Sequence, residues 1–233
     1  MIHQELENSD YRIRKLIGTL GLCLPFILLI VKGELLASIS HYYYCTLSSL
    51  FFIIILSAFA LFLISYKGYK KDVTTELISD DIITNIGGFA ALILVFIPTR
   101  CIDSTSATID LICEHGNYPL FGHDNPYKNA IHLISAAIFI LSMGWMSKYK
   151  FTRNKDDVNN KLYRICGNIV FISVGFIVLM IILEKLGVGK DLWFFKHYVF
   201  IFETTAVIPF GISWLIKGRV IDDMRRFKNT IFQ

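Results

Sequence analysis

Charged residues are scarce in this 233-residue sequence, at 18% of the total, whereas apolar residues make up 54%. A soluble domain carries about 25% charged residues, so an ordinary soluble fold is disfavoured. Five cysteines are too few for a small disulfide-stapled domain, and five prolines with fifteen glycines exclude a collagen. A mean hydropathy of +0.54 also excludes a disordered chain. The composition therefore indicates a membrane protein.

Six stretches that are nearly free of charge are long enough to cross a bilayer. A helix needs about 20 residues, at about 1.5 Å each, to span roughly 30 Å of hydrocarbon. The sequence therefore predicts an all-α polytopic bundle of six transmembrane helices, forming a single membrane domain over residues 1–233. The predicted spans are residues 16–31, 45–66, 82–99, 129–147, 165–183 and 198–216.

The first span is expected to be retained in the mature chain. A signal peptide ends at a cleavage site of small residues, whereas Lys32, Gly33 and Glu34 follow this run. The small residues at 37–40 leave removal of the first span open as an alternative.

Basic residues fall mainly on one side of the predicted membrane. With six spans both termini lie on one side, and that side receives 17 of the 23 Lys and Arg residues. Because basic residues near span ends resist translocation, this side is predicted to be cytoplasmic. The net charge of +4 is explained by topology, so no nucleic-acid partner is predicted. The tail, residues 217–233, has apolar residues at helical spacing and is expected to be an amphipathic helix on the inner leaflet.

The longest predicted outer connection contains Cys101 and Cys113. They would close a short loop in a compartment that could be oxidising, so we take this pair as a disulfide candidate.

Glu203 is the only carboxylate inside the last predicted span. It lies six residues beyond His197, which is about 9 Å along a helix, and an ionisable group at that depth costs several kcal/mol unless it is paired or faces a cavity. We therefore expect Glu203 to point into the bundle. His41 and His132 stand at the outer mouths of other spans and are expected partners, and a protonated Glu203 bonded to a serine is the alternative.

Three consecutive tyrosines, residues 42–44, stand at the outer boundary of the second span. They sweep about 200° around a helix, so at least one hydroxyl is expected to turn inward. Together with Glu203 they predict an outward-facing polar pocket that binds a lipid head group or a small amphiphile, with membrane lipids as partners. The candidate pocket residues are Ser40, His41, Tyr43, His132, Ser135 and Glu203.

Two other functions are left open. A metal-dependent membrane lipid hydrolase would use zinc, but no His-x-x-x-His or His-Glu-x-x-His spacing is present, so no cofactor is predicted. An oligomeric channel or membrane effector of a defence or signalling system would require a homo-oligomer. Soluble nucleotide chemistry is disfavoured, because no Gly-rich phosphate loop or Gly-x-Ser-x-Gly elbow occurs. The weak metal candidates are His41, His132, His197 and Glu203.

Five distinct short motifs lie in or near the predicted spans. They are Ser40 with Tyr42 to Tyr44, residues 66–69 (Tyr-Lys-Gly-Tyr), residues 96–99, Ile131-His132 with Ser135-Ala136, and Glu203 with residues 210–218. In these motifs the chain resembles a group of bacterial six-span integral membrane proteins of unknown function, and more loosely DRAM-like six-helix proteins. The resemblance implies a multi-pass protein of the bacterial inner (plasma) membrane, with membrane or lipid handling at most. The zinc-binding ceramidase superfamily differs in having seven spans and a late His-x-x-x-His pair.

Overall fold

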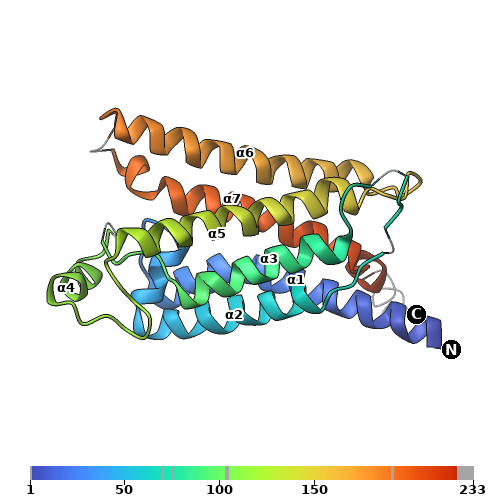
Figure 1. The fold of residues 1–233 in the computed structure, drawn as a ribbon, viewed down its shortest axis with the longest axis horizontal. Coiled ribbons are helices and arrows are strands. Elements are labelled where there is room, and N and C mark those ends of the chain that lie inside the picture. Colours follow the sequence, from blue (N-terminus) through green and yellow to red (C-terminus); the bar gives the residue numbers. More distant parts are fainter. Residues whose placement is uncertain (1, 70, 75, 103–104, 190–191, 225–233) are drawn as a thin grey trace.

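The computed structural model describes residues 2–69, 71–74, 76–102, 105–189 and 192–224. The described residues form helices and connections without strands, and the chain is 75% helical. Figure 1 shows long helices running along a common axis. The start of the first helix and the end of the last lie at one end of the bundle, called here the termini end. A short helix, α4, lies at the opposite end, called the α4 end.

The six long helices have the following bounds: α1 (Ile2–Lys32), α2 (Thr46–Ser65), α3 (Asp80–Phe96), α5 (Pro126–Trp145), α6 (Asn160–Lys185) and α7 (Trp193–Lys217). Three shorter elements connect them: the 3-10 helix η1 (Ile39–Tyr44), α4 (Ala107–His115), and a π-helical turn η2 (Met146–Lys150) that extends α5.

Five of these helices are long and apolar enough to cross a membrane, which confirms the prediction of an all-helical membrane bundle. Their spanning segments are residues 10–32, 46–65, 126–150, 160–185 and 193–217. Helix α3 is not among them, because its 17 residues extend only about 26 Å. It begins where the Ser79 side chain caps it, and it ends just before Pro98, which cannot continue a helix.

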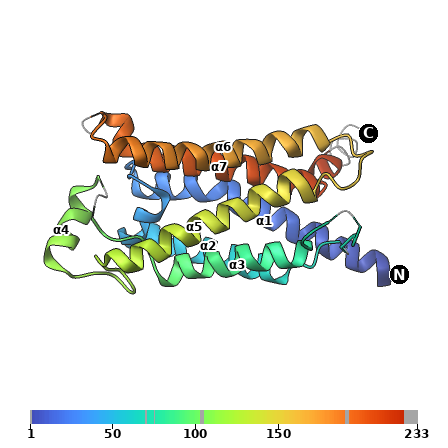
Figure 2. The same cartoon turned by 45° about the horizontal axis from the view of Figure 1, so that its top comes forward.

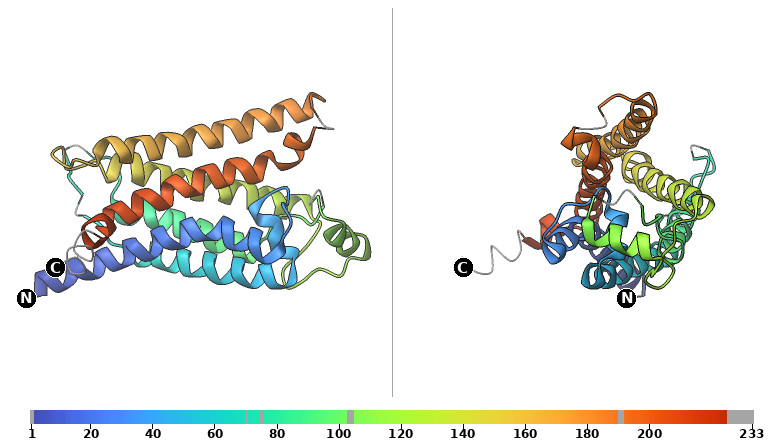
Figure 3. Two further views of the ribbon diagram at one scale, coloured as in Figure 1. Left: turned by 180° about the vertical axis from the view of Figure 1, so that it is seen from behind. Right: turned by 90° about the vertical axis from the view of Figure 1, so that its left-hand side faces the viewer.

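The long helices form a closed ring in chain order. Each contacts the next along the chain, α4 excepted, and α7 returns to contact α1. Figure 3 shows the ring from the α4 end, and Figure 2 shows the α6–α7 pair on one side with α2 and α3 on the other. The ring of Phe59 fills the middle, with its centroid 5.4 Å from that of Phe139 and 5.3 Å from that of Phe210. Two small voids, of about 20 and 40 Å³, lie beside these aromatic rings in the described part of the chain.

Glycines allow the ring to close between α1 and α7. A Cβ atom added at Gly211 would lie 2.8 Å from the carbonyl oxygen of Gly18 and 3.0 Å from the nitrogen of Leu22. The two backbones therefore touch. Since lipid tails solvate apolar side chains as well as a neighbouring helix does, such close contact is a main source of affinity between membrane helices.

The predicted tail is only partly described. Residues 220–224 are helical, and Asp223 forms an ion pair with Lys15 of α1. Residues 225–233 lie outside the described residues.

Candidate functional site

The structure brings Ser40, His132 and Glu203 to the α4 end of the bundle. His132 Nε2 lies 2.9 Å from Ser40 Oγ, which joins α5 to η1. Glu203 Oε2 accepts a hydrogen bond of 2.8 Å from the backbone N–H of Ile39. Glu203 thus points into the bundle, as its depth in α7 predicted, but the group that binds it here is a backbone amide and not an imidazole.

His41 and Tyr43 lie in the same η1 turn, yet their polar atoms bind the surrounding loops. His41 Nδ1 is 2.9 Å from Ser38 Oγ, and the Tyr43 hydroxyl accepts from the N–H of Phe121 at 3.2 Å. Ser135 borders a different groove, on the outer surface between α3 and α5. Of the six predicted pocket residues, Ser40 and Glu203 therefore share the lining of one small void, and Ser135 borders a different groove.

Three histidines form hydrogen bonds with the segment that follows α3. Backbone carbonyls outside helices have no intrahelical partner, and imidazole N–H groups can satisfy them. His132 Nδ1, His123 Nε2 and His41 Nε2 lie 2.8, 2.9 and 3.2 Å from three carbonyl oxygens beyond the end of α3. These carbonyls belong to Ile97, Pro98 and Ile102.

The void beside Glu203 and Ser40 has a volume of about 40 Å³, and the rest of its wall is apolar. A water molecule takes about 30 Å³ in the liquid, so this space suits a single water. Among the described residues, no cluster of three or more His, Cys, Asp or Glu side chains could hold a metal ion. His197 is turned toward its own helix, with Nδ1 2.9 Å from the carbonyl oxygen of Trp193.

Cys101 and Cys113 form a disulfide, with their Cα atoms 5.7 Å apart, as the sequence predicted. This disulfide links α4 to the segment after α3 that the three histidines bind. All three predicted tyrosines are buried, and the hydroxyl of Tyr44 donates to the carbonyl oxygen of Thr99 at 2.6 Å. The α4 end is therefore a closed cap of hydrogen bonds.

Replacing Glu203 tests the structural role of its carboxylate. We expect Glu203→Ala to lower the free energy of unfolding by about 1–3 kcal/mol, because the buried N–H of Ile39 loses its acceptor. Glu203→Gln keeps a carbonyl acceptor and is expected to stay close to wild type. Thermal unfolding in mild detergent measures both variants. A Gln variant as unstable as the Ala variant would show that the charge itself is needed.

His123 makes the α4 end sensitive to acid. Burial lowers its pKa, a hydrogen bond to the carbonyl of Pro98 opposes this shift, and the charge of Lys128 adds to it. The ordinary value is about 6.5. Because the pKa is lower in the folded state, the unfolded state binds more protons, so stability is complete above about pH 6.5 and is lost as the pH falls toward the folded pKa. We expect melting curves at pH 7.5 and 5.5 to differ less for His123→Gln than for wild type. Equal differences would contradict this account.

A cavity of about 570 Å³ opens at the termini end. Its wall combines basic side chains with tyrosines from five parts of the chain. The basic residues and tyrosines are Lys150, Arg153, Lys217, Arg219, Tyr11, Tyr69 and Tyr163.

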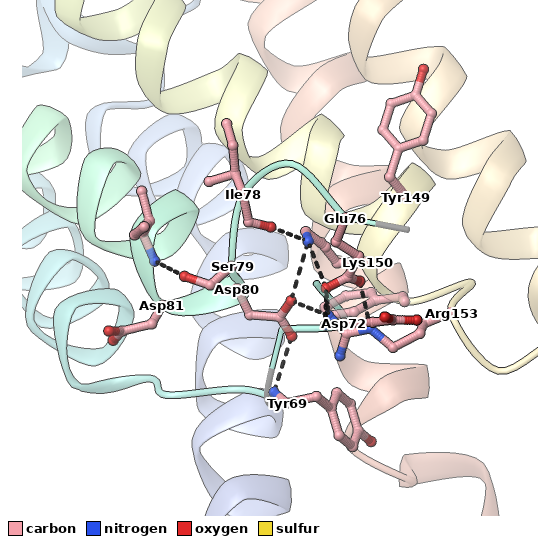
Figure 4. A network of polar contacts seen from close by, with 12 residues as sticks. Tyr69, Asp72, Glu76, Ile78, Ser79, Asp80, Asp81, Tyr149, Lys150 and Arg153 are labelled. Carbon is pink, nitrogen blue, oxygen red and sulfur yellow. Dashed lines mark hydrogen bonds and ion pairs between the residues drawn. The ribbon is translucent and has the colours of Figure 1, made fainter. Parts of the chain in front are cut away.

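Two carboxylates hold Arg153 at this cavity (Figure 4). Its Nε donates to Glu76 Oε1 at 2.6 Å, and its Nη2 donates to Asp80 Oδ1 at 2.7 Å. Lys150 Nζ lies 3.4 Å from Glu76 Oε2 and 3.8 Å from Asp80 Oδ1. Burial raises the pKa of Glu76, but the hydrogen bonds and charge of Arg153 more than offset this and leave the pKa below its ordinary value.

The carboxylates lie behind the cations, since neither Glu76 nor Asp80 lines the cavity. The third guanidinium nitrogen of Arg153, Nη1, is buried and has no partner among the described protein groups. Because this nitrogen has almost no accessible surface, it does not face the cavity, and its unmet hydrogen bond is a cost to stability. On the cavity wall itself four basic residues outnumber two acidic ones, Asp157 and Asp222.

The ring of Tyr69 lies close to three basic side chains. Its ring centroid lies 5.1 Å from the guanidinium of Arg14, 5.3 Å from that of Arg153 and 5.9 Å from Lys217 Nζ. Its backbone N–H donates to Asp80 Oδ2 at 3.1 Å. Gly68 permits this turn, because it has a φ of +66° and a Cβ there would collide with Asp80. The Tyr-Lys-Gly-Tyr motif at 66–69 is thus folded around the Asp80 carboxylate.

Sequence reasoning missed this site, because it took the basic residues on this side only as a signal of membrane orientation. The available signal was the glycine between two tyrosines at 66–69, directly after a span.

A comparison with family models, curated proteins and solved structures finds no match to this chain.

Proposed function

We propose that the chain is a six-span membrane protein of the bacterial inner membrane, with both termini in the cytoplasm, and that it binds an anionic ligand in the cavity at the termini end. The observation that carries the proposal is the lining of this cavity. Four basic residues and three tyrosines face about 570 Å³ of space together with two aspartates, Asp157 and Asp222, while the carboxylates that balance Arg153 and Lys150 do not line it.

The ligand class follows from the donors. A guanidinium forms short, charge-assisted hydrogen bonds with phosphate and carboxylate oxygens, and two arginines, Arg153 and Arg219, line the cavity. The volume of the cavity falls within the range of about 300–1,000 Å³ found for small-molecule sites. Lys217 adds a point charge, although Asp157 lies 3.4 Å from it. We infer that a phosphate group is the best match.

The sixth span in this proposal is α3. It lies between α2 and α5 in the ring, so it shares the depth of two spanning helices. Its outer face is exposed and apolar, which suits contact with lipid. A helix that is a few ångströms short is accommodated at modest cost by local thinning of the bilayer. The exposed residues on this face are Ile82, Ile86, Phe89, Ile93 and Phe96.

Orientation can be tested by cysteine labelling. The termini end carries the basic connections and the α4 end carries the disulfide, which supports a cytoplasmic termini end. In a variant with Cys23, Cys45 and Cys166 replaced, we expect His115→Cys to react with an impermeant thiol reagent in intact cells. Asp156→Cys is expected to react only after permeabilisation, and the reverse pattern would overturn the orientation.

Ligand binding can be tested with inorganic phosphate. Purified protein in detergent is expected to bind phosphate in calorimetry and to melt at a higher temperature in its presence. Arg153→Gln should abolish both effects. Lys196→Gln, an exposed change at the α4 end, is the matched control and should bind normally. The absence of phosphate binding to wild type, both in detergent and in lipid nanodiscs, would overturn the proposal.

The predicted ligand pocket around Ser40 and Glu203 stays a hypothesis. The described contacts support it less than the cavity at the termini end, because its void suits about one water molecule.

A further inference from the structure

A second cavity, of about 250 Å³, adjoins the first at the termini end. We call the 570 Å³ cavity the large lobe and this one the small lobe. Both lobes are lined by Tyr11, Arg219 and Asp222, so they meet at these residues. The two cavities therefore form one site with two compartments.

Arg219 and Tyr11 form the divider between the lobes. The guanidinium of Arg219 lies 4.1 Å from the centroid of the Tyr11 ring, a short cation–π distance. Arg219 has a φ of +61°, a left-handed conformation that disfavours residues other than glycine. This backbone turn, two residues after the end of α7, places the charged guanidinium of Arg219 at the boundary between the two lobes.

Each lobe has basic residues of its own. Arg153, Lys150 and Lys217 line only the large lobe, whereas Arg12 and Lys15 line only the small one. Lys15 is paired with Asp223, so Arg12 and Arg219 are the main source of positive charge in the small lobe.

Acidic residues also face the lobes and limit what they bind. Asp157 is close to Lys217, and Asp223 is close to Lys15, so both are largely balanced. Asp222 lines both lobes and opposes an anion in either one. Removing its charge is therefore expected to strengthen the binding of any anion.

We propose, on the basis of the proposed function, that the ligand carries two phosphate groups on a short linker, one in each lobe, on either side of the Tyr11–Arg219 pair. The small lobe is below the usual size of a complete small-molecule site but accommodates one anionic group. The large lobe takes the other group together with the linker. Tethering makes the second contact intramolecular, which raises affinity without enlarging either compartment.

The test compares ligands that differ by one phosphate. Fructose 6-phosphate and fructose 1,6-bisphosphate form the soluble pair. Nanodiscs containing phosphatidylglycerol or cardiolipin, matched in total phosphate, form the lipid pair. Calorimetry and thermal shift are expected to show the bisphosphate bound at least tenfold more tightly in one of the two pairs, which identifies the source as soluble or lipid.

One variant locates the second phosphate, and another tests the acidic residue that both lobes share. Arg12→Gln changes an exposed residue of the small lobe, and we expect it to reduce bisphosphate affinity about tenfold while monophosphate affinity stays unchanged. Asp222→Asn is expected to tighten bisphosphate binding several-fold, a gain that misfolding cannot produce. Lys196→Gln again serves as the control.

Failure of this inference differs from failure of the proposed function. If monophosphate and bisphosphate bind equally, and both depend on Arg153, the two-lobe ligand is overturned and anion binding stands. If Arg12→Gln weakens both ligands equally, or if Asp222→Asn leaves bisphosphate affinity unchanged, the assignment of a second phosphate is also overturned. If no phosphate compound binds in either pair, both proposals fall.

Discussion

Replacing Asp80 by alanine is expected to lower the free energy of unfolding by about 3–5 kcal/mol, the range for removing one partner of a buried ion pair. The Asp80 side chain is 1% exposed and lies between Arg153, Lys150 and the N–H of Tyr69. Its loss leaves two cations sharing Glu76 and a backbone donor without an acceptor. Unfolding of the purified protein by heat or by sodium dodecyl sulfate would measure the effect.

The neighbouring Asp81 provides the control for this change. It is also in the first turn of α3, where either carboxylate interacts favourably with the helix dipole. Figure 4 shows it directed away from the Arg153 network, and its carboxylate accepts a 3.2 Å hydrogen bond from the side chain of Asn85. We expect Asp81→Ala to cost about 0.5–1.5 kcal/mol. Equal losses from the two variants would mean that the network around Asp80 adds nothing beyond helix capping.

Replacing Gly211 by alanine is expected to destabilise the bundle by about 1–3 kcal/mol through overpacking. The added Cβ would lie 2.8 Å from the backbone oxygen of Gly18, and backbone atoms cannot move aside as a flexible side chain can. The α1–α7 seam must therefore open. Resistance to unfolding by sodium dodecyl sulfate is the measurement.

A second glycine separates this effect from helix propensity. Gly175 lies in α6, and among the described residues no neighbouring side chain or other helix comes within 4 Å of the position that its Cβ would take. Alanine there is expected to stabilise the protein by about 0.5–1 kcal/mol, because alanine favours helix more than glycine does. Destabilisation at both sites by the same amount would argue against close backbone contact at the seam.

The sequence predicted the helices well because hydrophobic length is a local property. Uncharged runs located the cores of all six long helices, and the cost of a buried charge placed Glu203 inside the bundle. The predicted ends of the helices were less accurate. Helix α1 begins at Ile2 and not near residue 16, because charged residues can continue a helix beyond the bilayer.

The cavity at the termini end could not be predicted in the same way. Tyr69 and Arg153 come from two different connections and Lys217 from the end of α7, and only the folded chain brings them together. Membrane orientation alone accounts for basic residues on that side, so their charges gave no separate sign of a binding site. The histidines at the α4 end were assigned to a ligand pocket for a related reason. In a sequence, an imidazole that binds a backbone carbonyl cannot be distinguished from one that binds a ligand or a metal.

Because the order of helices around the ring is their order along the chain, each helix that emerges during synthesis meets a permanent neighbour at once. Only α1 must wait, since its second neighbour, α7, is the last of the six long helices. Lys217 and Arg219 lie at the end of α7 and just after it, so the proposed anion site requires that α7 has been made and packed against α1. Cutting the chain before α7 would therefore remove the proposed site together with the second helix contact of α1.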